Sequence, residues 1–140
     1  MKLTCNLVEV NKYTANNRLY TEEALQKAVD KFNEKENVVG ELEPENSGNE
    51  INFANISHKL KDLKLEEGKL VADIEILSTP SGKELINHDL NNFELFPRFI
   101  GALDPNDNTY VVIEDLISID LKRKEDLEET YRLIEENNKE

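Results

Sequence analysis

The chain has 140 residues with a formal net charge of −13, and 38% of the residues are hydrophobic. A chain of this length buries about two-thirds of the surface of its unfolded form, so it can fold as one domain without a cofactor. Nucleic-acid binding requires a clustered basic surface, which this charge excludes. The acidic excess serves solubility, and it also suits a protein that binds a basic partner or occupies a nucleic-acid site as a mimic.

Cys5 is the single cysteine, which excludes an internal disulfide and a cysteine-based zinc site. The first residues lack the apolar stretch of a signal peptide, and no run approaches the roughly 20 apolar residues of a membrane span. We therefore expect a protein that works in the cytoplasm of the cell that makes it.

The N-terminal third predicts two strands separated by a helix. Apolar residues alternate over 3–10, and the alternation changes phase after Leu7, as at a β-bulge. Thr21 is suited to cap a helix that runs to about Glu34, because acidic residues fill its first turn. A short strand is expected over 38–42.

The middle third carries the clearest β pattern. A strand over 53–65 is followed by a turn at Glu67-Gly68 and by a strand over 70–76 in which apolar and polar residues alternate. A second helix is expected to begin around Pro80, because proline suits the first helical turn. Its apolar face is predicted to comprise Leu85, Ile86 and Leu90.

The last third predicts two or three strands and a charged helix. A strand over 94–103, interrupted at Pro97, turns at 106–108 into one or two strands over 110–121. A terminal helix is expected over 124–137, with a narrow apolar stripe of Leu127, Tyr131 and Ile134. Such a stripe docks on the domain, or it serves a partner or a second copy of the chain.

Four segments, in chain order, resemble the prohead (head maturation) proteases of tailed phages, distant relatives of the herpesvirus assemblin proteases. They are Asn16-Asn17-Arg18-Leu19-Tyr20, then Gly40-Glu41-Leu42, then Asn55-Ile56-Ser57-His58 with Ile76-Leu77-Ser78-Thr79-Pro80-Ser81-Gly82-Lys83, and finally Leu116-Ile117-Ser118-Ile119-Asp120-Leu121. The segment around Thr79-Pro80 is the most specific match.

The resemblance implies an α+β fold, a small and strongly bent β-barrel or sheet. We expect about six to seven strands with two to three surrounding helices. The prohead-protease-like domain is expected over 1–121, and the charged C-terminal helix over 122–140.

Serine hydrolysis needs a nucleophile, a histidine that takes its proton, and usually a group that fixes that histidine's tautomer. The resemblance implies that His58 is the histidine. The serine positions fall on Phe96 and Pro97, whereas Arg98 and Gly101 match the family. Neither Phe96 nor Pro97 can attack a carbonyl, so we expect a vestigial site in which these residues lie on a strand close to His58.

Glu41 belongs to the same vestigial site through the matching segment Gly40-Glu41-Leu42. Glu43 then stands where the family often carries a histidine before the proline. These departures fall at positions that the chemistry requires, so the resemblance implies a family fold without its catalytic serine.

Other residues could supply a displaced nucleophile. Ser57 adjoins His58, but neighbouring side chains on a strand point to opposite faces and do not easily meet. Ser78 and Ser81 sit at a helix start, where capping explains them.

The remaining candidates have structural explanations. Ser118 is expected to pack within a strand, and Cys5 to act as a small buried apolar residue. His88 lies near a helix end, where a cation or a hydrogen bond to free carbonyls is favourable. Two histidines exclude a histidine-rich metal site, and residues 104–108 indicate a turn because they lack the glycine and final glutamate of an EF-hand loop.

We therefore expect a phage-encoded, non-catalytic relative of prohead proteases that acts as a structural or binding protein in head assembly. The alternatives are an active serine peptidase with a displaced nucleophile and an acidic inhibitor of a host defence or nucleic-acid protein. The expected partner is a phage structural protein, a host protein or a second copy of the chain. We expect no cofactor, metal, nucleic acid or membrane, and a location in the host cytoplasm or on the virion.

Overall fold

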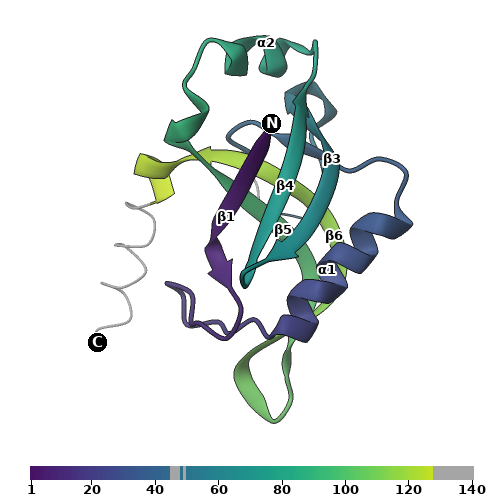
Figure 1. The fold of residues 1–140 in the computed structure, drawn as a ribbon, viewed down its shortest axis with the longest axis vertical. Helices are drawn as coiled ribbons and strands as arrows, with labels where there is room; N and C mark the ends of the chain where they lie inside the picture. The colour runs from purple at the N-terminus through teal and green to yellow at the C-terminus, as the bar shows by residue number, and fades with distance from the viewer. Residues whose placement is uncertain (45–47, 49, 128–140) are drawn as a thin grey trace.

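Two antiparallel sheets form the fold in the computed structural model, which describes residues 1–44, 48 and 50–127 (Figure 1). Within these residues the helices and strands are β1 (Lys2–Glu9), α1 (Glu22–Glu34), β2 (Val39–Glu41), β3 (Ile56–Glu66), β4 (Lys69–Ile76), α2 (Pro80–Ile86), β5 (Phe93–Asp104) and β6 (Asp107–Arg123). Short 3₁₀ turns precede two of the strands, η1 (Phe53–Asn55) before β3 and η2 (Leu90–Asn92) before β5.

A curled four-stranded sheet, in the order β1-β4-β3-β2, faces the long two-stranded ribbon β5-β6. The two sheets meet at both edges. At one edge the Asn6 backbone N–H of β1 donates to Glu94 Oε1 of β5 at 2.8 Å, and at the other the Glu43 N–H donates to the Leu121 carbonyl at 2.8 Å. The predicted α+β fold, a small and strongly bent sheet with helices around it, is confirmed.

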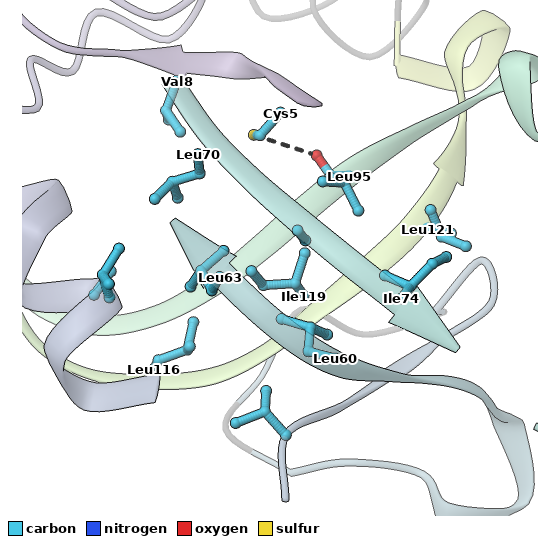
Figure 2. Packing of buried hydrophobic residues seen from close by; sticks show 14 of the residues in the cluster. Cys5, Val8, Leu60, Leu63, Leu70, Ile74, Leu95, Leu116, Ile119 and Leu121 are labelled. Carbon is cyan, nitrogen blue, oxygen red and sulfur yellow. Dashed lines mark hydrogen bonds between the residues drawn. The ribbon is translucent and has the colours of Figure 1, made fainter. Parts of the chain in front are cut away.

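The core lies between the curled sheet and the ribbon (Figure 2). It comprises buried side chains from both layers, including Cys5, Val8, Leu60, Leu63, Leu70, Ile74, Leu95, Leu116, Ile119 and Leu121. Helix α1 packs on β3 and β6 and adds Leu25 and Ala28, both fully buried. Each fully buried leucine contributes about 2 kcal/mol to folding, so an aliphatic core suffices here.

The local sequence signals place the first helix and the central hairpin as predicted. Thr21 caps α1, and its hydroxyl accepts the Ala24 N–H at 3.1 Å. The turn between β3 and β4 has positive φ at Glu67 (50°) and Gly68 (82°), the conformation of a two-residue hairpin turn. The predicted irregularity in β1 is present between Thr4 and Glu9.

Three details of the predicted elements were wrong. The strand predicted from residue 53 begins at Ile56, because Asn52 caps the 3₁₀ turn η1 before it. Strand β5 is not interrupted at Pro97, which pairs with Ile119, since proline removes one donor without preventing extended backbone. Ile86, predicted on the apolar face of α2, is 64% exposed, because α2 ends there after two turns.

The C-terminal region is described up to Leu127. Strand β6 continues to Arg123, residues 124–127 are helical, and Leu127 is buried. The other two residues of the predicted stripe, Tyr131 and Ile134, lie outside the described residues, so the boundary at 121/122 and the helix to residue 137 stay predictions. No helix in the described part of the chain is long and apolar enough to span a membrane.

Candidate functional site

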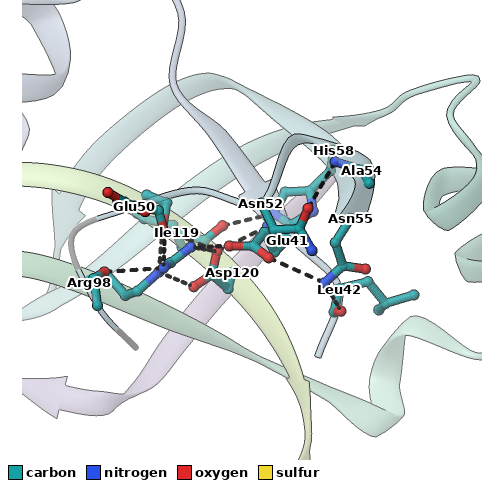
Figure 3. Close-up of polar contacts among 12 residues, drawn as sticks. Glu41, Leu42, Glu50, Asn52, Ala54, Asn55, His58, Arg98, Ile119 and Asp120 are labelled. Carbon is teal, nitrogen blue, oxygen red and sulfur yellow. Dashed lines mark hydrogen bonds and ion pairs between the residues drawn. The ribbon is translucent and has the colours of Figure 1, made fainter. Parts of the chain in front are cut away.

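His58 lies on β3 directly opposite Gly40 of β2, and its side chain is fully buried (Figure 3). A Cβ atom at residue 40 would lie 2.2 Å from His58 Nε2 and 2.1 Å from the Ile119 carbonyl oxygen. Only glycine leaves room for the imidazole between β2 and β6. The Gly40-Glu41-Leu42 segment therefore has a steric role that the structure makes explicit.

Both nitrogens of the His58 ring are engaged. Nε2 lies 2.7 Å from the Ile119 carbonyl oxygen, and Nδ1 lies 2.7 Å from Ser57 Oγ. A carbonyl can only accept, so Nε2 carries the proton and Nδ1 accepts the Ser57 hydroxyl. Burial lowers the pKa of His58 to about 4, which keeps the ring neutral near neutral pH.

The expectation that Ser57 and His58 do not meet was wrong. Successive side chains of a regular strand alternate between its faces, but Ser57 Oγ and His58 Nδ1 lie only 2.7 Å apart. The pairing of β2 with β3 is also irregular beside Gly40, which loosens the strict alternation. Both side chains are fully buried, so a substrate cannot reach this pair in the folded structure.

A second group of buried polar residues, the ion cluster, comprises Glu41, Arg98, Ser118 and Asp120 (Figure 3). Arg98 Nη2 lies 2.6 Å from Glu41 Oε2, and Arg98 Nε lies 2.6 Å from Asp120 Oδ2. Arg98 Nε also donates to Ser118 Oγ at 2.8 Å, and Nη1 donates to the carbonyls of Gly48 and Glu50 at 3.2 and 3.1 Å. One guanidinium thus joins β2, β5, β6 and the segment before η1.

The charges of the ion cluster do not cancel when all three groups are ionised. Two carboxylates face one guanidinium, and burial raises the pKa of Asp120 although the Glu41 N–H and Arg98 oppose the rise. Removing one member of a buried pair leaves an uncompensated charge and costs about 3–5 kcal/mol. The match at Arg98 therefore marks a structural residue of this fold.

The two residues at the serine positions, Phe96 and Pro97, lie on β5 as predicted. Pro97 pairs with Ile119, whose carbonyl accepts a hydrogen bond from His58 Nε2. Pro97 therefore lies on the strand next to the residue that His58 contacts. Gly101 is not brought to this site. It pairs with Ile113, which lies six residues, or roughly 20 Å of strand, from Ile119.

Phe96 and Pro97 line a surface cleft of about 390 Å³, and Glu43 lines the same cleft. His58 lies outside its lining. The three residues that replace the expected serine and histidine, Phe96, Pro97 and Glu43, therefore face one cleft.

The expected roles of the other serines and of Cys5 were correct in part. Thr79, not Ser78 or Ser81, caps α2 and accepts the Gly82 N–H at 3.0 Å; the Ser81 hydroxyl instead donates to Asn55 Oδ1 at 2.9 Å. Cys5 is buried as predicted, and burial raises the pKa of its thiol to about 11, which excludes a thiolate at neutral pH.

His88 and residues 104–108 show no sign of a metal site. The His88 ring packs edge-on against Phe93, with the ring centroids 6.0 Å apart. Asp104 Oδ1 accepts the Asn106 N–H at 2.7 Å, as in a polar turn. No group of three potential metal ligands occurs within residues 1–44, 48 and 50–127.

Sequence reasoning missed two carboxyl groups, Asp120 in the ion cluster and Asp126 beside the cleft. A signal for Asp120 was available, because Ser118 and Asp120 alternate with Ile119 and Leu121 and so share the face opposite the core. Asp126 gave no such signal, because it lies in a run of charged residues.

The described residues define a small α+β fold in which a curled four-stranded sheet faces a two-stranded ribbon. The particular likeness is to the bacteriophage T4 capsid assembly protease, gp21, with a TM-score of 0.62, 20% sequence identity, and coverage of 86% of this chain and 80% of that one. At this identity the likeness shows the fold alone. No protein-family model and no curated protein matches the sequence.

Proposed function

We propose that this chain is a non-catalytic, phage-encoded relative of the capsid assembly proteases, and that it acts as a binding or structural protein in head assembly. The observation that carries the proposal is the state of His58. Its ring is fully buried, both nitrogens are bonded, and the nearby strand positions that would hold the nucleophile are Phe96 and Pro97.

Catalysis would require a base that can take a proton from a hydroxyl within reach of substrate. The Nε2–H of His58 donates a hydrogen bond to the Ile119 carbonyl. The ring is also a weak base, because burial lowers the pKa of His58 to about 4. Loss of chemistry with retention of the fold leaves binding as the activity that this scaffold can perform.

A second candidate function, an active serine peptidase with a displaced nucleophile, is favoured by one observation. Ser57, His58 and the Ile119 carbonyl form a chain of hydrogen bonds in which the carbonyl fixes the tautomer of the base. For the hydrogen-bonded pair of Ser57 and His58 to act on a substrate, β2 must move away from its place opposite His58. The non-catalytic function therefore also predicts that β2 stays paired with β3 in solution.

The assembly role is tested in the phage that encodes the chain. Proheads are purified from cells that make an epitope-tagged copy, and each capsid protein is measured by intact mass. We expect the tagged chain to sediment with proheads, and cells with His58→Gln to yield capsid proteins of unchanged mass. Absence from proheads would contradict the assembly role, and capsid cleavage that His58→Gln abolishes would contradict the non-catalytic one.

A further inference from the structure

The cleft beside Phe96 has an aromatic and apolar floor. Phe96, Pro97 and Phe99 contribute from β5, and the Phe99 ring packs against Tyr20 with the centroids 5.9 Å apart. Lys122 Nζ lies 3.9 Å from the centroid of the Phe96 ring. Lys122, which also lines the cleft, thus already places a cation over the Phe96 ring, as aromatic faces allow.

One rim of the cleft carries two carboxyl groups, Glu43 and Asp126. The structure holds Glu43 in place, because its N–H donates to the Leu121 carbonyl at 2.8 Å and its Oε1 accepts the Arg123 backbone N–H at 2.7 Å. Arg123 Nε also lies 3.6 Å from Glu43 Oε1. Burial raises the pKa of Glu43, the Arg123 N–H opposes the rise, and the carboxyl of Asp126 adds to it. A further cation at these two carboxyl groups would add to the partial compensation that Arg123 gives Glu43.

We propose that this cleft binds an arginine-bearing extended segment of a partner protein. The arginine displaces Lys122 from the Phe96 ring, its stem lies on Phe96 and Phe99, and its guanidinium lies at Glu43 and Asp126. Arginine fits because its planar guanidinium pairs with carboxylates in a fork and stacks on aromatic rings. Charge selects the partner as well, since the chain's net charge of −13 attracts a basic segment and repels a second copy of itself.

This inference rests on the proposed function, because it takes the cleft to be a binding site that has lost its nucleophile. The positions that depart from the protease pattern supply the floor, at Phe96 and Pro97, and a fixed anion, at Glu43. In this arrangement, the substitutions that remove hydrolysis are the same ones that make the cleft a receptor for a cationic side chain.

The probe is a fluorescent peptide with one central arginine flanked by leucines, compared with the same peptide carrying glutamine. Binding to the full chain is followed by fluorescence polarisation and by NMR shifts of backbone amides. We expect the arginine peptide to bind at least tenfold more tightly, with shifts centred on Phe96, Phe99 and Glu43. Raising the salt concentration should weaken binding.

Two double variants with the same change in charge distinguish binding at the cleft from a general attraction to the acidic protein. Glu43→Gln with Asp126→Asn should weaken binding of the arginine peptide about tenfold, as expected for the loss of charge-assisted bonds. Glu66→Gln with Glu67→Gln, at the exposed turn between β3 and β4, should leave affinity within a factor of two. A Phe99→Leu variant should bind both peptides more weakly, because the substitution removes aromatic surface from the cleft.

Several results would overturn the inference. Equal binding of the two peptides, equal loss in both double variants, or shifts away from the cleft would each do so. Dimerisation that competes with the peptide would assign the cleft to a second copy. A peptide that is bound and also cleaved would support the cleft assignment while refuting the non-catalytic function, whereas a peptide that is neither bound nor cleaved would refute only the cleft assignment.

Discussion

The Nε2 atom of His58 lies 2.7 Å from the carbonyl oxygen of Ile119, so the histidine at the centre of the resembled protease motif ties β3 to β6. The same ring accepts the hydroxyl of Ser57 on its other nitrogen. In this fold the histidine joins the two sheets, and its burial favours the neutral form of the ring.

The fit of His58 against β2 predicts a large effect of one methyl group. Gly40→Ala should lower the free energy of unfolding by about 3 kcal/mol, because its Cβ would overlap the imidazole and the Ile119 carbonyl. Gly48→Ala is the matched control, since a Cβ there meets nothing within 4 Å and should change stability by less than about 0.5 kcal/mol. Urea unfolding followed by circular dichroism measures both, and equal stability of the two variants would show that the ring is not packed on Gly40.

Burial of neutral His58 predicts a pH dependence of stability. Its pKa is about 4 in the folded protein against an ordinary 6.5, so the unfolded chain binds the proton more tightly. The contribution of neutral His58 to the free energy of unfolding is fully present above pH 6.5. It falls by about 3 kcal/mol in total as the pH drops towards 4.

A variant isolates the contribution of His58 from that of the many carboxyl groups. His58→Gln retains a donor that can reach Ile119 but has no titration, so its stability should fall less steeply between pH 6.5 and 4 than that of the wild type. Denaturant midpoints at five pH values measure the difference. Parallel pH profiles would mean that the imidazole is solvated in the folded state.

The ion cluster predicts a sharp contrast between buried and exposed charge. Arg98→Met should cost about 3–5 kcal/mol, because Glu41 and Asp120 would then be buried without a cation. Lys35→Met removes a pair with Asp115 whose side chains are 34% and 40% exposed, and it should cost less than about 1 kcal/mol. Thermal unfolding compares the two, and a mild effect of Arg98→Met would mean that water reaches the cluster.

Pro97→Ser tests whether a hydroxyl at a position that the resemblance assigns to the catalytic serine is enough for reaction with a serine-directed reagent. The variant should fold, since serine suits a strand at least as well as proline, but it should not react with a fluorophosphonate. The Pro97 side chain lines the cleft, whereas His58 lies outside that lining with its Nε2 proton committed to Ile119. Rapid labelling of the variant at residue 97 would show that His58 can serve as a base from its buried position.

The sequence predicted the fold better than the site. Periodicity and caps placed α1, the β3-β4 hairpin and the β5-β6 ribbon because these depend on neighbours in the chain. The Ser57–His58 contact and the ion cluster depend on side-chain rotamers and on strands far apart in sequence, such as Glu41 with Asp120. Alternation alone assigned Ser57 and His58 to opposite faces, whereas Ser57 Oγ and His58 Nδ1 lie 2.7 Å apart.

If this fold carries no working serine–histidine pair, the wild-type chain should not react with a reagent directed at activated serines. The full chain and Ser57→Ala are incubated with a fluorophosphonate at pH 8, and the adduct is measured by intact mass over hours. We predict no adduct above that of the unfolded chain, because Ser57 and His58 are fully buried. Stoichiometric labelling of the wild type that Ser57→Ala abolishes would contradict it and would make the chain a peptidase with a displaced nucleophile.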